Sequence, residues 1–241
     1  MIQNSRADRA AFYSPYSFIR GASALGEAWL DDLAACQATG DVSTFEGSNG
    51  SAVYYRQLPW DTDFFGVPTL RVEFTDHTAE TPVQALSQNF NAFFQRLSAE
   101  HPSYYLFAEV PCEDTQTILA MSQAGMRLIE TRLTYYRDDI QRFELARRDA
   151  VRSAIEADIP TLRQCAIDSV NHFDRFHADD FFTPQQSDDF MGVFVENSVK
   201  GFADEVLVPE TGLADAFLTA NYVKPPAVLA HPQIGKMVLS P

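Results

Sequence analysis

Residues 201–241, GFADEVLVPETGLADAFLTANYVKPPAVLAHPQIGKMVLSP, form the stretch from which the expected fold follows. Three runs in this stretch have the apolar, β-favouring composition of strands, at residues 202–208, 213–220 and 234–240. Turn-forming residues separate the runs: Pro209 and Gly212, then Pro225 and Pro226. Because successive strands with short links usually pair with each other, the stretch predicts a three-strand antiparallel meander.

The composition is that of a globular protein with an acidic surface. The 241 residues are 46% hydrophobic and 21% charged, which suffices for one large domain or two small ones. A formal net charge of −15 disfavours binding to nucleic acid and to anionic membranes. We find neither a run of about 20 apolar residues nor a signal peptide, so we expect no membrane partner and a cytoplasmic location.

The cysteines and the common hydrolase motif point to no special chemistry. Cys36, Cys112 and Cys165 are odd in number and far apart, with no C-x-x-C pair, so we expect neither a disulfide framework nor a metal site. Cys165 falls on an apolar helix face, which favours a core position over a nucleophile. No G-x-S-x-G nucleophile motif is present.

Upstream of the meander, hydrophobic periodicity divides the chain into two α/β units. In the first, helices are predicted at residues 22–38, 83–100 and 114–123, and strands at 52–58, 70–74, 104–110 and 127–136. Ile118, Leu119 and Met121 are expected to be buried on the third helix. The charged residues 138–149 predict a linker, so the domains are placed at 1–140 and 150–241.

The second unit begins with a predicted strand at residues 151–155. A helix with Asp158 as its N-cap follows, then a helix over 184–198 and the closing meander. The fold class is therefore α/β (α+β), with two mixed, largely antiparallel sheets flanked by helices.

Residues 59–68 are predicted to form a loop that carries aromatic and acidic side chains. Trp60, Phe64 and Phe65 either fill an edge of the core or provide a platform for a sugar or base ring. In the second case Asp61 or Asp63 would bind hydroxyl groups or an ammonium, since loops at strand ends often carry binding residues.

Three motifs resemble acyltransferases of the GNAT superfamily. The opening V-R-x-A-x-x-x-D-I-x-x-L at residues 151–162 is similar to the start of such domains. The segment LPWDTDFFG at 58–66 resembles L-x-W-D-x-x-F-F-G of the dTDP-fucosamine acetyltransferase branch, and DRFHAD at 174–179 resembles its S-R-F-H-x-D. The resemblance covers residues 50–241 approximately. It implies two GNAT-like units, acetyl-CoA as the cofactor and a nucleotide-linked amino sugar as the substrate.

The resemblance also implies a cofactor site on the last strand. There the backbone of Val238, Leu239 and Ser240 would pair with the pantetheine arm, and a backbone N–H would meet the oxyanion. Glu205 or Asp215, both expected on meander strands, could orient the amine and act through water as a general base, or could simply face solvent.

Two further residue types are candidates in the connection between the helices of the second unit. His172 and His177 could accept the amine proton, or could be surface histidines. Arg175 could bind a nucleotide phosphate, or could form an ion pair with Asp179 or Asp180. His177 and Glu205 are therefore the candidate catalytic residues, and Trp60, Asp61, Phe64 and Arg175 are the candidate substrate-binding residues.

One departure from the family pattern qualifies this prediction. GNAT enzymes follow the fourth strand with a Q/R-x-x-G-x-G/A loop whose N–H groups hold the cofactor pyrophosphate, and no such motif follows Ser240. We therefore expect a second unit that is incomplete at its C-terminus. The alternatives are a non-catalytic sugar- or nucleotide-binding module, an inactive remnant, and a homodimer formed through the exposed strand 234–240.

Overall fold

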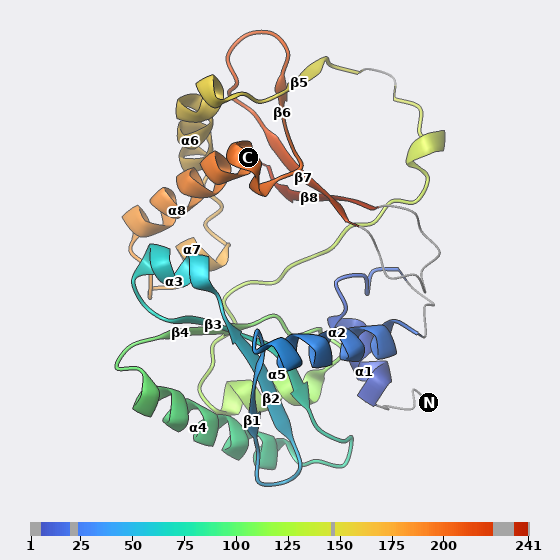
Figure 1. Ribbon diagram of the computed structural model, residues 1–241, viewed down its shortest axis with the longest axis vertical. Coiled ribbons are helices and arrows are strands. Elements are labelled where there is room, and N and C mark those ends of the chain that lie inside the picture. Colours follow the sequence, from blue (N-terminus) through green and yellow to red (C-terminus); the bar gives the residue numbers. More distant parts are fainter. Residues whose placement is uncertain (1–5, 20–23, 146–147, 224–233, 241) are drawn as a thin grey trace. The chain divides into compact units, whose positions relative to one another are not determined.

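The computed structural model describes residues 6–19, 24–145, 148–223 and 234–240 (Figure 1). The chain divides into two compact units, residues 1–128 and 129–241. The charged segment 138–149 lies within the second unit, and the loop containing Pro225 and Pro226 lies outside the described residues. Among the described residues, no helix combines the length and the apolar character needed to cross a bilayer.

The first unit is a four-stranded sheet with helices on both faces. Its elements are α1 (Arg6–Tyr13), α2 (Leu25–Thr39), β1 (Ser43–Glu46), β2 (Ala52–Gln57), α3 (Pro59–Phe65), β3 (Thr69–Asp76), α4 (Val83–Glu100), β4 (Tyr105–Ala108) and α5 (Thr115–Gln123). The strand order is β1-β2-β3-β4, antiparallel except for the parallel pair β3–β4. The 18-residue helix α4 makes the crossover that a parallel pair requires.

The second unit contains a four-stranded, fully antiparallel sheet. Its elements are η1 (Ile140–Arg142), β5 (Val151–Ser153), η2 (Glu156–Asp158), α6 (Ile159–Asp168), α7 (Arg175–Ala178), α8 (Pro184–Asn197), the π-helical turn η3 (Ser198–Phe202), β6 (Glu205–Pro209), β7 (Leu218–Val223) and β8 (Ile234–Leu239). The strand order is β5-β6-β7-β8. The predicted mixed α/β class with largely antiparallel sheets is thus confirmed.

Each unit has its own hydrophobic core. In the first, Val53 and Val72 pack with Phe93 of α4 on one face of the sheet, and Phe74 packs with Leu33 of α2 on the other. In the second unit, α6 and α8 lie side by side and cover the sheet face that carries Val206 and Val208. Burial of these side chains is the main source of stability in each unit.

A β-bulge occupies the third meander strand of both units. In the first unit Tyr54 and Tyr55 pair with Phe74 and Val72, which leaves Glu73 of β3 as the extra residue. In the second unit Thr219 and Ala220 pair with Leu239 and Met237, which leaves Val238 of β8 as the extra residue. The bulge explains why Val72 and Phe74 lie in different cores, because an inserted residue reverses the alternation of faces.

In the first unit, one predicted element and the predicted buried face of one helix were wrong. Residues 59–65 form helix α3 and not a loop, because Pro59 suits the first helical turn and Gly66 ends the helix at a φ of 68°. On α5, Ile118 and Leu119 are exposed, and Thr117, Ala120 and Met121 are buried instead. The short helix rotates the polar Thr117 inward, where it contacts Asp114.

Two predicted strands also differ from the structure. The run 127–136 forms no strand, and its side chains beyond Glu130 are exposed, because no neighbouring strand pairs with it in the described sheets. The second meander strand begins at Leu218 rather than at residue 213. Ala214 and Phe217, which the alternation placed in that strand, are buried in the core as part of the preceding loop.

Candidate functional site

The bulge in β8 is where the predicted cofactor-binding residues lie. The hydroxyl of the buried Thr219 accepts a hydrogen bond from the Leu239 N–H at 2.9 Å and lies 3.3 Å from the Leu239 carbonyl oxygen. A side chain of β7 therefore replaces a regular ladder bond beside the extra residue Val238. Such bulges kink a strand and direct its backbone away from the regular ladder.

Strand β8 lies at the end of the strand order and is largely accessible. Met237 is 73% exposed and Val238 is 42% exposed, whereas Leu239 packs at the margin of the core. Ser240 is exposed just beyond the strand. An edge strand presents backbone N–H and C=O groups that can pair with an extended partner. The backbone at Val238, Leu239 and Ser240 thus lies at an accessible edge of the sheet.

Glu205 lies on the same sheet, opposite the helix-covered face. The register places Glu205 beside Ala220 and Ala220 beside Met237, in one row across three strands. Two strand spacings separate Glu205 from β8, roughly 10 Å. The Ser153 hydroxyl donates a hydrogen bond of 3.0 Å to the Glu205 carboxylate. The Glu205 carboxylate is thus held in one orientation and is half-buried. Its distance from the bulge leaves room for a small molecule between them.

His177 lies on α7, not in a loop as predicted, and both its ring nitrogens face carboxylates. Nδ1 is 2.8 Å from Asp174 Oδ2, and Nε2 is 3.3 Å from Asp188 Oδ1 on α8. Asp174 also accepts hydrogen bonds from the backbone N–H groups of Phe176 and His177, which makes it the N-cap of α7. Proton uptake from a substrate amine would therefore require His177 to release one carboxylate first.

Arg175 is buried at the start of α7. Its guanidinium carbon lies 4.4 Å from the centre of the Phe176 ring, and its backbone N–H donates to Glu130 Oε2 at 3.0 Å. Stacking on an aromatic ring and burial hold this side chain against the protein. The resulting geometry suits a positioning role for α7 better than direct capture of a phosphate from solvent.

The remaining candidates of the second unit are separated from this sheet face. Asp215 lies in the loop before β7 and not on a strand, and its carbonyl oxygen is 3.0 Å from Cys165 Sγ. Burial raises the pKa of the Cys165 thiol, which agrees with a packing role for that cysteine. His172 is exposed between α6 and α7.

Trp60, Asp61 and Phe64 lie on helix α3 of the first unit. The rings of Trp60 and Phe64 are one helical turn apart with centroids 6.0 Å from each other, and Phe64 meets the buried Phe65 edge-on at 4.9 Å. Asp61 occupies the first turn of α3, where its negative charge interacts favourably with the helix dipole. This packing supports the core-edge interpretation of the aromatic residues.

Asp158 has a different role from the predicted N-cap. Its carboxylate accepts two hydrogen bonds from Arg152, at 2.7 and 2.9 Å, and one from the Ile155 N–H at 2.9 Å, but none from the first turn of α6. The Arg152 hydrogen bonds, assisted by the Ile155 N–H, lower the pKa of Asp158 to about 2. In the V-R-…-D-I motif that resembles the start of GNAT domains, Arg152 and Asp158 therefore form a salt bridge that joins strand β5 to the start of helix α6.

A buried polar cluster in the first unit had no counterpart in the sequence prediction. Asp114 accepts hydrogen bonds from the Tyr13 hydroxyl at 2.7 Å and the Thr117 hydroxyl at 2.9 Å, and it lies 3.4 Å from His77 Nε2. Arg9 donates to the carbonyl groups of His77 and Thr75. Only the helix start at Asp114 was visible in the sequence, as an N-cap residue before an apolar run.

The ionisation of this cluster follows from its contacts. Burial by itself raises the pKa of Asp114, but hydrogen bonds from His77, Tyr13 and the Thr117 backbone outweigh it and bring the pKa down to about 2. Burial and the neighbouring Asp114 charge raise the pKa of Tyr13 well above its ordinary value. The cluster ties α1 to β3 and α5, so its evident role is structural.

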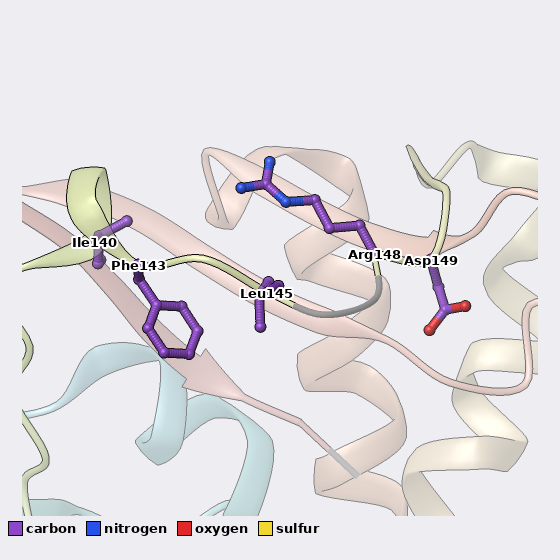
Figure 2. A pocket seen from close by; sticks show the side chains of 5 residues that line it. All are labelled: Ile140, Phe143, Leu145, Arg148 and Asp149. Atoms are coloured by element: carbon purple, nitrogen blue, oxygen red, sulfur yellow. The ribbon is translucent and has the colours of Figure 1, made fainter.

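A surface hollow of about 440 Å³ is lined by Ile140, Phe143, Leu145, Arg148 and Asp149. Figure 2 shows the Phe143 ring and the Arg148 guanidinium on opposite sides of the backbone that carries them. Arg137 already lies over the Phe143 ring at 3.5 Å. The hollow contains none of the predicted site residues, and its open form does not suit a substrate cavity.

Comparisons of the chain with known protein families, with curated proteins and with solved structures found no match.

Proposed function

We propose that this chain belongs to the acetyl-CoA-dependent N-acetyltransferases, with a nucleotide-linked amino sugar as the acceptor, in two units of the GNAT type. The observation that carries the proposal is the bulged, accessible edge strand β8, which follows helices α6 and α8 and two antiparallel strands. An extended pantetheine arm is a fitting partner for such an edge. The matching bulge in β3 supports the expectation that the two units share one plan.

In the proposed reaction, the neutral amine attacks the thioester carbonyl carbon directly. A backbone N–H at the β8 bulge stabilises the oxyanion that forms on the carbonyl oxygen. Glu205 accepts the amine proton through a water molecule, and its Ser153 hydrogen bond keeps the carboxylate oriented. Collapse of the intermediate breaks the C–S bond, and the coenzyme A thiolate leaves and takes up a proton.

The test is an acetyl-transfer assay that detects free thiol, with acetyl-CoA and a panel of amino sugars and dTDP-amino sugars. The proposal predicts turnover, and a loss of at least about 100-fold in Glu205→Gln, the usual size of a general-base contribution. Glu210→Gln is the matched control, because Glu210 is an exposed carboxylate just beyond the end of the same strand. Equal rates in the two variants would remove Glu205 from the mechanism.

A second candidate function is a non-catalytic sugar- or nucleotide-binding module. The enclosure of His177 by Asp174 and Asp188 favours it, since a catalytic imidazole would need an accessible nitrogen. A dTDP-amino sugar that binds this chain without any transfer from acetyl-CoA would decide for this candidate.

A third candidate, which would compete with the pantetheine arm for the same edge of β8, is a homodimer formed by pairing this strand with its counterpart in a second copy. Lys236 and the exposed Met237 would lie at that contact. Sedimentation analysis should then show a dimer that Met237→Pro converts into a monomer. A monomer at all concentrations would exclude this assembly.

A cytoplasmic location remains part of the proposed acetyltransferase function.

A further inference from the structure

The bulge in β3 gathers two arginines around one buried carboxylate. Glu73 is the extra residue of the bulge, and its side chain is only 5% exposed. Arg71 Nε donates a hydrogen bond of 2.7 Å to Glu73 Oε1, and Arg56 Nε lies 2.7 Å from the same oxygen. Arg56 and Arg71 are directly opposite each other on β2 and β3, and their side chains are 27% and 33% exposed.

The two guanidinium groups have unused hydrogen-bonding capacity. Within residues 6–19, 24–145, 148–223 and 234–240, their only hydrogen bonds and ion pairs go to Glu73, and the one hydrogen bond among these contacts uses Arg71 Nε. The Arg56 Nε is buried and its contact with Glu73 is not aligned as a hydrogen bond. The terminal Nη groups of both arginines, which can form bidentate contacts with an oxyanion, therefore make no hydrogen bond to this part of the protein.

The charges of the cluster do not balance. Two positive groups and one negative group leave a surplus of one positive charge, in a chain whose formal net charge is −15. Like charges directly opposite on neighbouring strands are destabilising. The Glu73 carboxylate offsets only part of the repulsion between the two guanidinium groups, and it contacts the Nε atom of each. An anion seated on the Nη groups would offset the rest.

We infer that Arg56 and Arg71 form a binding site for a phosphoryl group of a small-molecule phosphate, with Glu73 as the residue that positions them. Arginine forks match the geometry of phosphate oxygens, and the charge-assisted hydrogen bonds formed are the strong ones. A single phosphoryl group can bridge two arginines on adjacent strands, which are about 5 Å apart. The site belongs to the first unit and does not depend on acetyl transfer in the second.

The test is calorimetric titration of the full chain with inorganic pyrophosphate, followed by dTDP and coenzyme A to identify the source of the phosphoryl group. Binding should weaken at least about tenfold in Arg71→Gln and in Arg56→Gln. Arg96→Gln is the matched control, since Arg96 lies in the same unit and pairs with Glu100 on the surface of α4. No binding of any probe at millimolar concentration, or equal losses in all three variants, would overturn the inference.

A second measurement needs no variant and is independent of folding defects. Phenylglyoxal modifies accessible guanidinium groups, and the modified peptides can be identified by mass spectrometry. Saturating pyrophosphate should protect Arg56 and Arg71 at least about fivefold and leave Arg96 unprotected, as tight contact with an anion would require. Equal reactivity of all three residues with and without pyrophosphate would contradict the site.

Discussion

At the scale of single residues, carboxylates held by several donors anchor both units. Asp158 joins β5 to the start of α6 through Arg152 and the Ile155 N–H, and Asp114 joins α1 and α5 through Tyr13 and Thr117. Each pKa is about 2, below the ordinary value of an aspartate. Each carboxylate therefore stabilises the folded state fully above pH 4 or so, and this contribution is lost as the pH falls toward 2.

The salt bridge at Asp158 gives the first prediction. Arg152→Gln removes both hydrogen bonds of the guanidinium, so the pKa of Asp158 should rise from about 2 toward its ordinary value. The rise should be incomplete, because the Ile155 N–H still donates to the carboxylate. NMR titration of the aspartate side-chain carbons between pH 1.5 and 6 measures it. An unchanged pKa would show that Arg152 does not hold Asp158 in solution.

The buried cluster gives the second prediction. Tyr13→Phe removes one hydrogen bond to the charged Asp114, which should lower the free energy of unfolding of the first unit by about 1.5–3 kcal/mol. Urea unfolding can be followed by tryptophan fluorescence, because Trp29 and Trp60 both lie in this unit. Tyr104→Phe is the control.

The control residue differs from Tyr13 in the quality of its hydrogen bond. The Tyr104 hydroxyl makes only long contacts, of 3.4 Å to the Phe94 carbonyl and 3.5 Å to the Ser98 hydroxyl, so its removal should cost less than about 0.5 kcal/mol. Similar losses in both variants would mean that the Asp114 cluster contributes little to stability.

At the scale of elements, the close approach of α1 and α2 gives the third prediction. A Cβ atom at Gly26 would lie 1.8 Å from the Ala7 carbonyl oxygen, so Gly26→Ala must force the helices apart. We expect a loss of at least about 3 kcal/mol in the same fluorescence-detected unfolding, at the upper end of overpacking effects. Helix propensity alone predicts the opposite sign, a gain of about 1 kcal/mol.

The control for this prediction is Ala35→Gly on the exposed face of α2. It should cost about 1 kcal/mol through helix propensity alone. If Gly26→Ala stabilised the unit instead, α1 and α2 could not approach each other in solution as closely as the structure shows.

The elements that could be predicted from the sequence are those with long, one-sided periodicity. The apolar stripe through Phe90, Phe93 and Leu97 placed α4 at residues 83–100, as the structure has it. Hydrophobic periodicity gave wrong predictions where a segment needs a strand from elsewhere in the chain to pair with. The run 127–136 has strand composition but no neighbouring strand in the described sheets. Helix α3 was missed although Pro59 and Gly66 carry helix start and stop signals, because its seven residues are too few for a clear period.

At the scale of the whole molecule, the candidate site depends on features that no local pattern contains. The bulges at Glu73 and Val238 appear only once strand pairing is known. The contact of Tyr13 with Asp114 spans 101 positions, and that of Ser153 with Glu205 spans 52. The apolar runs and turn residues of the meander correctly placed strand β8 and Glu205 in one sheet, but the enclosure of His177 and the pairing of Arg56 with Arg71 follow from tertiary packing.

The most direct test of the account is calorimetric titration with acetyl-CoA of the natural chain and of two variants, Val238→Pro and Val238→Ala. Proline removes the backbone N–H of the bulge residue and is tolerated at bulges of edge strands, whereas alanine keeps that N–H. We expect measurable binding by the natural chain and by the alanine variant, weakened by the missing pyrophosphate loop, and at least about tenfold weaker binding still by the proline variant. Absence of binding by the natural chain, or equal binding by all three proteins, would contradict the account.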